Sequence, residues 1–307
     1  MALPLTLISG YLGAGKTTFI NGLLGAANRE SARIVVLVND FGDVSLDALL
    51  ISSSTTDTIS LINGCACCLV SDDLEQQLSG LVEARHYDRV VFEASGVADS
   101  AKLLRQLRHF PGLEVSAHLT LVDLSVIQRQ VQDKFVGDHI AHQLMLARDI
   151  IETKADLLDE PQQTLVRQWL VQRYPAAEFH TIAAMPASPV VEFAAFTEDF
   201  LFATDTHPEF KSYRFRGSQR QAKAHLLTWL DNLPANVQRV KGFVWLLDDP
   251  RPHLLNYTPG CATISVYDGV LPAVLEDPLR AQSDLVAIVV QDGGQDGGQD
   301  SLLSQPF

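Results

Sequence analysis

The stretch Gly10-Tyr-Leu-Gly-Ala-Gly-Lys-Thr17 decides the fold of this chain. It fits the pattern G-x-x-x-x-G-K-[ST], and it lies between an apolar run at residues 3–9 and a helical pattern at residues 16–27. Glycines in such a strand–loop–helix unit let backbone N–H groups approach phosphate oxygens, and the helix N-terminus adds a positive dipole end. We therefore predict a phosphate-binding loop and not a glycine-rich turn with a chance lysine. Lys16 is expected to reach the β- and γ-phosphates, and the Thr17 hydroxyl is expected to ligate Mg²⁺.

The rest of the first two thirds of the chain alternates between apolar runs and helical patterns. Continuous apolar runs without a polar alternation are typical of strands buried on both faces of a parallel sheet. The alternation predicts an α/β fold, a P-loop NTPase with a doubly wound, mostly parallel sheet. The expected strands are residues 3–9, 33–38, 88–95, 115–123 and 148–153, and the expected helices are residues 16–27, 71–87, 101–109 and 160–174.

The pattern changes after the polar, turn-rich stretch at residues 203–212. One helical pattern and several short strand patterns follow, which indicates a small α+β domain. The end of the chain repeats Gly-Gly-Gln-Asp, a composition typical of a disordered tail. The predicted organisation is a P-loop domain at residues 1–203, a linker at 204–212, an α+β C-terminal domain at 213–290 and a tail at 291–307.

Net charge and hydropathy limit the classes of partner and the compartment that we expect for this protein. The formal net charge is −14, whereas a nucleic-acid-binding surface needs a basic footprint, so we expect no nucleic-acid partner. No apolar run approaches the roughly 18 to 20 residues that span a bilayer, so we expect no membrane partner. The apolar start lacks a basic region before it and continues into the phosphate loop, so we interpret it as a strand and not a signal peptide. These features predict a cytoplasmic protein.

The base of the nucleotide is predicted from the segment Thr153-Lys-Ala-Asp156. It fits the pattern [NTS]-K-x-D and comes directly after a predicted strand of the sheet. The Asp156 carboxylate can accept two hydrogen bonds from guanine N1 and N2, whereas adenine offers no matching pair of donors. The Lys154 stem can lie along the plane of the base. We therefore expect GTP, with a P-loop ATPase or a small-molecule kinase as the alternative.

Carboxylates follow two other predicted strands. Glu93 ends the run VVFE, where a carboxylate suits Mg²⁺ or its water shell, and the N–H of Gly96 can meet the γ-phosphate. Asn39 to Asp47 reads NDFGDVSLD and lies where a switch loop senses the γ-phosphate and its metal. We expect Asp43 and Asp47 to contact the metal or the attacking water, although loop aspartates are often only solvated.

Three of the four cysteines lie within four residues, in the segment Asn63-Gly-Cys-Ala-Cys-Cys68. Cys65, Cys67 and Cys68 are poorly spaced for a relaxed disulfide, and the fourth cysteine, Cys261, is far away in the sequence. Thiolates are ligands for Zn²⁺ and Cu⁺ and also accept Co²⁺. C-x-C-C does not form a closed four-cysteine site, so an open site for a metal that is handed on is one interpretation. A buried turn of small residues is the other, and a thioredoxin-like redox site is disfavoured because C-x-x-C is absent.

The ordered set GYLGAGKTT, NDFGDVSLD, NGCACC, EASG and TKAD resembles the CobW family of P-loop GTPases, relatives of the HypB and UreG metal-insertion GTPases. The later RVKGFVWL resembles the C-terminal domain of that family. The resemblance implies a GTPase domain, phosphate and Mg²⁺ binding by the phosphate loop, a Mg²⁺-side acid at Glu93, base reading by Lys154 and Asp156, and a transition-metal site at Cys65, Cys67 and Cys68. The implied catalytic set is Lys16, Asp43, Asp47 and Glu93, and the implied nucleotide-binding set is Gly10, Gly13, Ala14, Gly15, Lys16, Thr17, Thr18, Gly96, Lys154 and Asp156.

The sequence departs from the family pattern at three places. Asp40 and Asp43 stand where glutamates are common, so each side chain is one methylene shorter. Thr153 replaces the commoner asparagine of the base motif. A histidine-rich metal-collecting segment is absent, since the stretch between the domains holds only His207.

These features predict a GTP-hydrolysing metallochaperone, slow without its client, that uses GTP, Mg²⁺ and Zn²⁺ (or Co²⁺). It would deliver the metal, zinc in preference to cobalt, to a client metalloprotein, and a nucleotide- or metal-dependent homodimer is possible. The alternatives are a non-enzymatic nucleotide-switched scaffold with structural cysteines and an activator of a metalloenzyme that uses another metal.

Overall fold

The computed structural model describes residues 2–30, 32–41, 57–63, 72–182, 208–269, 271 and 283–291. The chain divides into two compact units, residues 1–208 and 209–307. The predicted switch-loop residues Asp43 and Asp47, the three clustered cysteines, residues 204–207 of the predicted linker and residues 292–307 of the predicted tail lie outside the described residues. Among the described helices, none is both long and apolar enough to cross a membrane.

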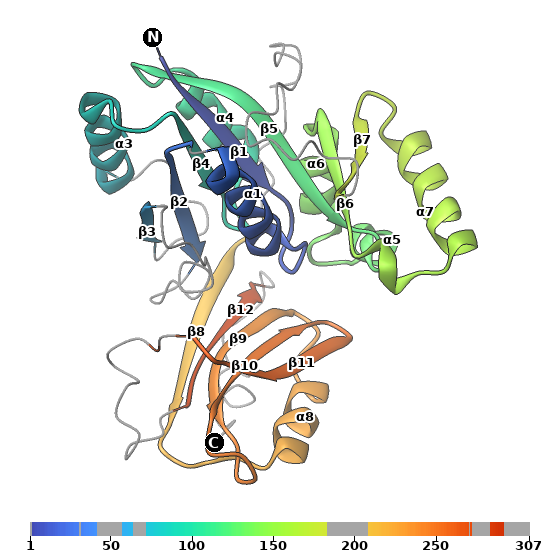
Figure 1. The fold of residues 1–307 in the computed structure, drawn as a ribbon. Helices are drawn as coiled ribbons and strands as arrows, with labels where there is room; N and C mark the ends of the chain where they lie inside the picture. The colour runs from blue at the N-terminus through green and yellow to red at the C-terminus, as the bar shows by residue number, and fades with distance from the viewer. Residues whose placement is uncertain are drawn as a thin grey trace. The chain divides into compact units, whose positions relative to one another are not determined.

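The first unit is built on a seven-stranded sheet in the order β3-β2-β4-β1-β5-β6-β7 (Figure 1). Every neighbouring pair of strands in this sheet is parallel. β1 is central and β2 lies two places away from it, so the chain leaves the middle of the sheet and fills both sides. The strands are β1 (Leu3–Ser9), β2 (Ile34–Phe41), β3 (Asp57–Asn63), β4 (Arg89–Glu93), β5 (Leu113–Asp123), β6 (Asp149–Thr153) and β7 (Glu178–Thr181).

Helices connect these strands and begin at residues that cap them. The Asp99 side chain accepts hydrogen bonds from the first backbone N–H groups of α4, and Asp159 forms a capping box with Gln162 at the start of α7. Pro161 occupies the first turn of α7, where a missing N–H costs nothing. The helices are α1 (Lys16–Glu30), α3 (Asp72–Ala84), α4 (Ser100–Arg108), α5 (Ile127–Val131), α6 (Gly137–Met145) and α7 (Glu160–Arg173).

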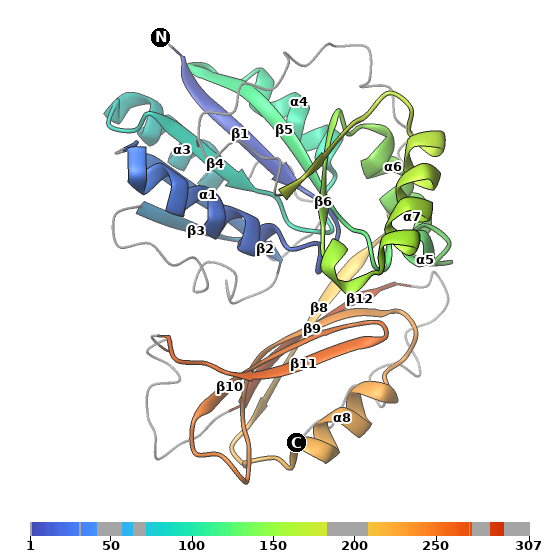
Figure 2. The same ribbon diagram turned by 45° about the vertical axis from the view of Figure 1, so that its right-hand side comes forward.

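The sheet is covered on both faces, which makes it doubly wound (Figures 1 and 2). On one face, Phe19, Ile20 and Leu24 of α1 pack against buried side chains of β1, β2, β5 and β6. On the other face, α3 and α4 contribute leucines that pack against β1, β2 and β4. Burial on both faces explains why the strands read as continuous apolar runs. The phosphate loop therefore follows a strand that the core holds from two sides.

The second unit is a five-stranded antiparallel sheet in the order β11-β10-β9-β12-β8, with one helix packed on it. Leu226 and Leu230 of the helix are fully buried against the sheet. At Gly242 a Cβ would lie 2.0 Å from the Asp284 carbonyl oxygen, so β9 approaches β12 more closely there than another residue allows. The elements are β8 (Phe210–Gly217), α8 (Lys223–Asp231), β9 (Val237–Trp245), β10 (Pro252–Thr258), β11 (Cys261–Val266) and β12 (Ser283–Val290).

The fold class predicted from the sequence is confirmed, because a parallel doubly wound sheet precedes a small α+β unit. β3, β7, α5 and α6 were not predicted from the sequence, and the structure adds all four. β8 begins at Phe210, so it includes three residues that the analysis placed in the linker at 204–212. The domain limits otherwise stay a prediction.

Candidate nucleotide-binding site

The loop after β1 has the backbone that phosphate binding requires. Gly10, Gly13 and Gly15 have φ angles of 128°, 80° and 90°, a region that side chains disfavour. A Cβ on Gly10 would lie 2.4 Å from the Leu121 carbonyl oxygen of β5. A residue other than glycine would therefore force the loop away from β5. The loop curves tightly at the carboxyl end of β1 and leads into α1, so its backbone N–H groups and the helix N-terminus face the same space.

Lys16 begins α1 and folds back over the loop. Its side chain is buried, and its ammonium group donates a 2.9 Å hydrogen bond to the carbonyl oxygen of Gly10. This contact places a positive charge across the mouth of the loop, where an anion would lie. An ammonium group at this point can donate a charge-assisted hydrogen bond to a phosphate oxygen. The role of Lys16 at the β- and γ-phosphates stays a prediction.

Thr17 and Glu93 form the second part of the site. The Thr17 hydroxyl donates a 3.3 Å hydrogen bond to Glu93 Oε1 at the carboxyl end of β4, and Glu93 is 3% exposed. A hydroxyl beside a buried carboxylate, next to a phosphate loop, is an all-oxygen donor set suited to Mg²⁺. The residues present therefore fit a Mg²⁺ ion bound with nucleotide, with Thr17 and Glu93 holding it directly or through water.

The segment after β4 packs directly on the phosphate loop. A Cβ on Gly96 would lie 2.7 Å from the backbone nitrogen of Leu12, so this position also requires glycine. Gln143 of α6 donates a 3.3 Å hydrogen bond to the carbonyl of Ala98 and lies 3.0 Å from the His139 ring. These contacts hold the segment that carries Gly96 against the loop. The role of the Gly96 N–H at the γ-phosphate stays a prediction.

The segment predicted to read the base is attached to the phosphate loop. Thr153 Oγ1 lies 2.9 Å from the Ala14 carbonyl oxygen and 3.1 Å from that of Val122. Lys154 has a left-handed backbone with φ of 54°, and its ammonium group donates a 2.6 Å hydrogen bond to Asp123 at the end of β5. This ion pair turns the Lys154 stem along the edge of the site. Asp156 lies in the following 3₁₀ turn and is exposed, so its carboxylate is accessible to a ligand.

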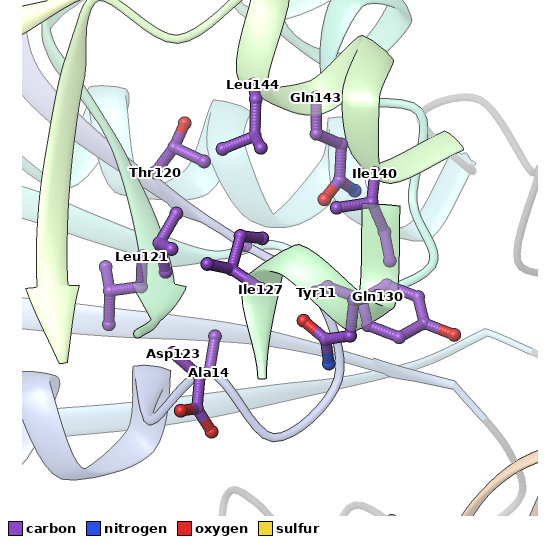
Figure 3. A pocket seen from close by; sticks show the side chains of 12 residues that line it. Tyr11, Ala14, Thr120, Leu121, Asp123, Ile127, Gln130, Ile140, Gln143 and Leu144 are labelled. Atoms are coloured by element: carbon purple, nitrogen blue, oxygen red, sulfur yellow. The ribbon is translucent and has the colours of Figure 1, made fainter. Parts of the chain in front are cut away.

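A small pocket adjoins the phosphate loop on the side of α5 and α6 (Figure 3). Tyr11, Ala14 and Asp123 line it together with side chains of both helices. Tyr11 is buried and meets the His139 ring edge-on at 6.3 Å between centroids, and burial raises the pKa of its hydroxyl well above the usual value. The pocket is lined largely by apolar side chains. These side chains pack against the loop and hold it in place, so the pocket does not resemble a second substrate site.

The structure thus brings together Lys16, Thr17, Glu93, Gly96 and Lys154, with Asp156 at the rim. Gly10, Gly13, Ala14, Gly15 and Thr18 lie in the loop or the first turn of α1. Asp43, Asp47, Cys65, Cys67 and Cys68 lie outside the described residues, and their roles stay predictions. Asp123 and Gln143 could not be identified from the sequence motifs, and Thr153, a departure from the commoner asparagine, contacts the loop through its hydroxyl.

Family profiles match most of the chain. Residues 4–181 match the profile described as "CobW/HypB/UreG, nucleotide-binding domain", and residues 210–298 match that of the "Cobalamin synthesis protein cobW C-terminal domain". The first match covers more than half of the chain, and together the two profiles correspond to the two structural units.

Three curated relatives illustrate the similarity. "Zinc chaperone CobW" of Sinorhizobium sp is 33% identical over 148 residues, covering 45% of this chain and 40% of the relative. "Zinc chaperone YjiA" of Escherichia coli is 32% identical over 173 residues, covering 52% of each chain. "Zinc-regulated GTPase metalloprotein activator 1" of Dictyostelium discoideum is 23% identical over 309 residues, covering 81% of this chain and 64% of the relative. The matched part of this chain spans about half the length of the first two relatives.

Proposed function

The chain belongs to the CobW/HypB/UreG family, and from this membership we propose that it hydrolyses GTP and delivers a transition metal to a client metalloprotein. The resemblance recognised from the five sequence motifs is thereby confirmed at the level of the family. The observation that carries the proposal is the joined site in which Lys16, Thr17 with Glu93, and Thr153 with Lys154 surround one phosphate loop.

Each of these residues has a defined task in phosphoryl transfer. The backbone N–H groups of the loop and the Lys16 ammonium group would neutralise the β- and γ-phosphates as charge moves between them. Thr17 and Glu93 would hold Mg²⁺, which supplies Lewis-acid charge at the phosphate oxygens. Asp43 and Asp47, from the segment after β2, would orient the attacking water. This machinery positions groups and neutralises charge, so slow turnover in the absence of a client is expected.

Guanine is proposed as the base because of the geometry around Lys154. The bond from Thr153 to the Ala14 carbonyl fixes the start of the base-reading segment to the phosphate loop. The Asp123 carboxylate orients the lysine stem, and the exposed Asp156 would accept the guanine N1 and N2 hydrogens. Adenine offers no matching pair of donors to this carboxylate, so the pair would favour guanine.

The metal is proposed to be zinc in preference to cobalt, bound as cargo by Cys65, Cys67 and Cys68. Support comes from the thiolate chemistry of the C-x-C-C motif and from the names of the relatives, which describe zinc chaperones and a zinc-regulated activator. The cysteine segment follows β3 and precedes the strand that ends at Glu93. The segment after β2, the cysteine segment after β3 and Glu93 at the end of β4 follow one another in the chain. The metal affinity of the cysteines would therefore depend on which nucleotide is bound.

The decisive experiment measures Zn²⁺ affinity of the full chain with Mg²⁺ and either a non-hydrolysable GTP analogue or GDP. We expect different affinities in the two nucleotide states and a loss of the difference in the Cys67→Ala, Cys68→Ala double variant. Cys261→Ala, which alters the exposed cysteine of β11, is the matched control and should behave as the unaltered chain. Equal Zn²⁺ affinity in both nucleotide states would contradict the coupling.

Hydrolysis is tested separately. GTP turnover with Mg²⁺ should be abolished by Lys16→Ala and should resist competition by ATP, whereas Asp156→Ala should remove the preference for GTP. No turnover with Zn²⁺ and a client present would leave a nucleotide-switched scaffold as the function. Turnover of ATP at the same rate as GTP would contradict the proposed base.

A further inference from the structure

Three side chains of metal-ligating types gather at the end of β6 that lies away from the phosphate loop. Asp149 is the first residue of β6, and Glu178 and His180 lie on the neighbouring β7. Asp149 pairs in register with Glu178, and Ile151 with His180, so the three side chains project from the same face of the sheet. One ligand atom from each residue lies within 4.8 Å of the corresponding atoms of the other two.

The three side chains differ in their exposure, from a buried carboxylate to one that lies in solvent. The Asp149 side chain is 5% exposed, that of His180 is 28% exposed, and Glu178 is exposed. His180 Nε2 lies 2.8 Å from Asp149 Oδ1, so the imidazole is already turned toward the buried carboxylate. A cation arriving from solvent would meet Glu178 first and Asp149 last. An entry path and preoriented donors are both requirements for a metal site.

Asp149 and Glu152 are both buried acids of β6, but they differ in the positive charge that lies beside them. Glu152, on the opposite face, is paired with the Arg167 guanidinium at 2.8 Å, a cation at every physiological pH. Asp149 meets the His180 imidazole, with a weaker favourable charge from Arg148 and an unfavourable one from Glu178. The buried carboxylate is therefore less well compensated than its neighbour.

We propose that Asp149, Glu178 and His180 bind a divalent transition-metal cation, Zn²⁺ in the first instance, with ligands that include neither the nucleotide-site residues nor the clustered cysteines. One imidazole nitrogen and two carboxylates are a donor set used by open zinc sites, which leave a position for water or an incoming ligand. The site lies four residues along β6 from Thr153, roughly 13 Å from the base-reading end of the strand.

The geometry needs only a small adjustment to accept the ion. Tetrahedral ligands at the usual zinc distances lie about 3.4 Å from one another. The 2.8 Å contact between Asp149 and His180 would open slightly, and Glu178 would close from within its 4.8 Å limit. The ion would lie between His180 Nε2 and Asp149 Oδ1 and take the place of their direct contact. Because Glu178 is exposed and His180 half-buried, their side chains can make these shifts without moving the strands.

The test uses the full chain with Cys65, Cys67 and Cys68 all changed to serine, which removes the thiolate site. Zn²⁺ alone, without nucleotide or Mg²⁺, is titrated against a chromophoric chelator. We expect one tightly bound Zn²⁺ in this background and at least tenfold weaker binding after Glu178→Gln or His180→Gln, because each change removes a ligand. Glu83→Gln and His86→Gln, at exposed residues elsewhere in the first unit, are the matched controls and should leave the affinity unchanged.

Two results would overturn the site. One is the absence of tight Zn²⁺ binding in the cysteine-free background, and the other is unchanged affinity in the Glu178→Gln variant. Glu178 is exposed at the edge strand, so this variant folds and decides the matter even if His180→Gln is unstable. With Co²⁺ in place of Zn²⁺, the visible spectrum of the background protein should show nitrogen and oxygen ligation, and Glu178→Gln should abolish it.

Discussion

Thr153 Oγ1 lies 2.9 Å from the carbonyl oxygen of Ala14, although 139 positions separate the two residues in the chain. The contact joins the end of β6 to the loop after β1, on either side of β5. It means that the part of the site predicted to read the base and the part that cradles phosphate are held at a fixed spacing. A threonine performs this task with one hydroxyl, which also lies 3.1 Å from the Val122 carbonyl.

Replacing Thr153 by valine should therefore weaken nucleotide binding. Valine keeps the shape of the side chain but leaves the Ala14 and Val122 carbonyls without the hydroxyl, a loss of about 1 kcal/mol. We expect roughly fivefold weaker GTP binding with little change in fold. Thr164→Val is the control, because that hydroxyl bonds only to the Glu160 carbonyl within exposed α7. Equal GTP affinity in the two variants, measured by titration calorimetry, would contradict the prediction.

Two glycine-to-alanine changes should shift stability in opposite directions. Gly10→Ala places a methyl group 2.4 Å from the Leu121 carbonyl at a φ of 128°, which should cost about 2 to 4 kcal/mol of unfolding free energy. Gly22→Ala adds a methyl group to α1 where nothing lies within 4 Å, so it should stabilise the chain by about 0.5 to 1 kcal/mol. Urea unfolding of both variants measures the two effects, and a Gly10→Ala variant as stable as the unaltered chain would refute the close approach.

The Asp123 carboxylate should matter for nucleotide binding more than for stability. Its ion pair with Lys154 involves a lysine whose side chain is 39% exposed, so its loss should cost at most about 1 kcal/mol. Asp123→Asn keeps an oxygen for Ser125 but releases the lysine stem, and we expect GTP affinity to fall severalfold while the melting temperature changes little. Asp88→Asn removes the exposed pair with Arg33 at 2.8 Å and should change neither nucleotide affinity nor specificity.

Acid should destabilise the first unit partly through His118. This imidazole is buried against the Ser9 hydroxyl, and burial lowers its pKa from 6.5 to about 4. The unfolded chain therefore binds a proton that the folded chain does not, and stability falls as the pH drops below 6.5 until it levels off below about 4. Between pH 7 and pH 5 this group should cost roughly 2 kcal/mol.

The measurement compares urea unfolding of the unaltered chain and His118→Gln at pH 7 and pH 5. The variant should lose roughly 2 kcal/mol less than the unaltered chain over this interval, whatever its stability at pH 7. His86→Gln alters an exposed histidine and should show the same pH dependence as the unaltered chain. The same loss in the His118→Gln variant as in the unaltered chain would show that this imidazole does not titrate as its burial implies.

Long apolar strands and well-capped helices of the first unit could be predicted because local patterns determine them. β1, β4 and β6 are buried along their whole length or nearly so, and α7 begins with an aspartate cap and a proline. The four missed elements lack such signals. β7 has only four residues, none fully buried, and α5 has five residues and no side-chain cap. Their structure depends on neighbours distant in the sequence, which no local pattern records.

The candidate site also contains residues that could be predicted from the sequence and residues that could not. The residues of the phosphate loop and the two motifs after β4 and β6 could be predicted from spacing, because the chemistry requires those residue types in sequence. Asp123 and Gln143 could not, because they act on residues 31 and 45 positions away. Their importance comes from the folding of β5 and α6 against the loop, and glutamine or aspartate at those positions has no local signature.

β6 has one further consequence for experiments on this protein. Its five residues are all buried, with Thr153 at one end and Asp149 at the other. β6 is therefore a rigid strand about 16 Å long. Ile151, at its centre, is fully buried. Shortening that one side chain by Ile151→Ala would leave a void beneath the middle of the strand, between its two ends. Ile151→Ala changes no residue of either ligand site. It therefore tests whether the two ends of the strand are coupled through β6.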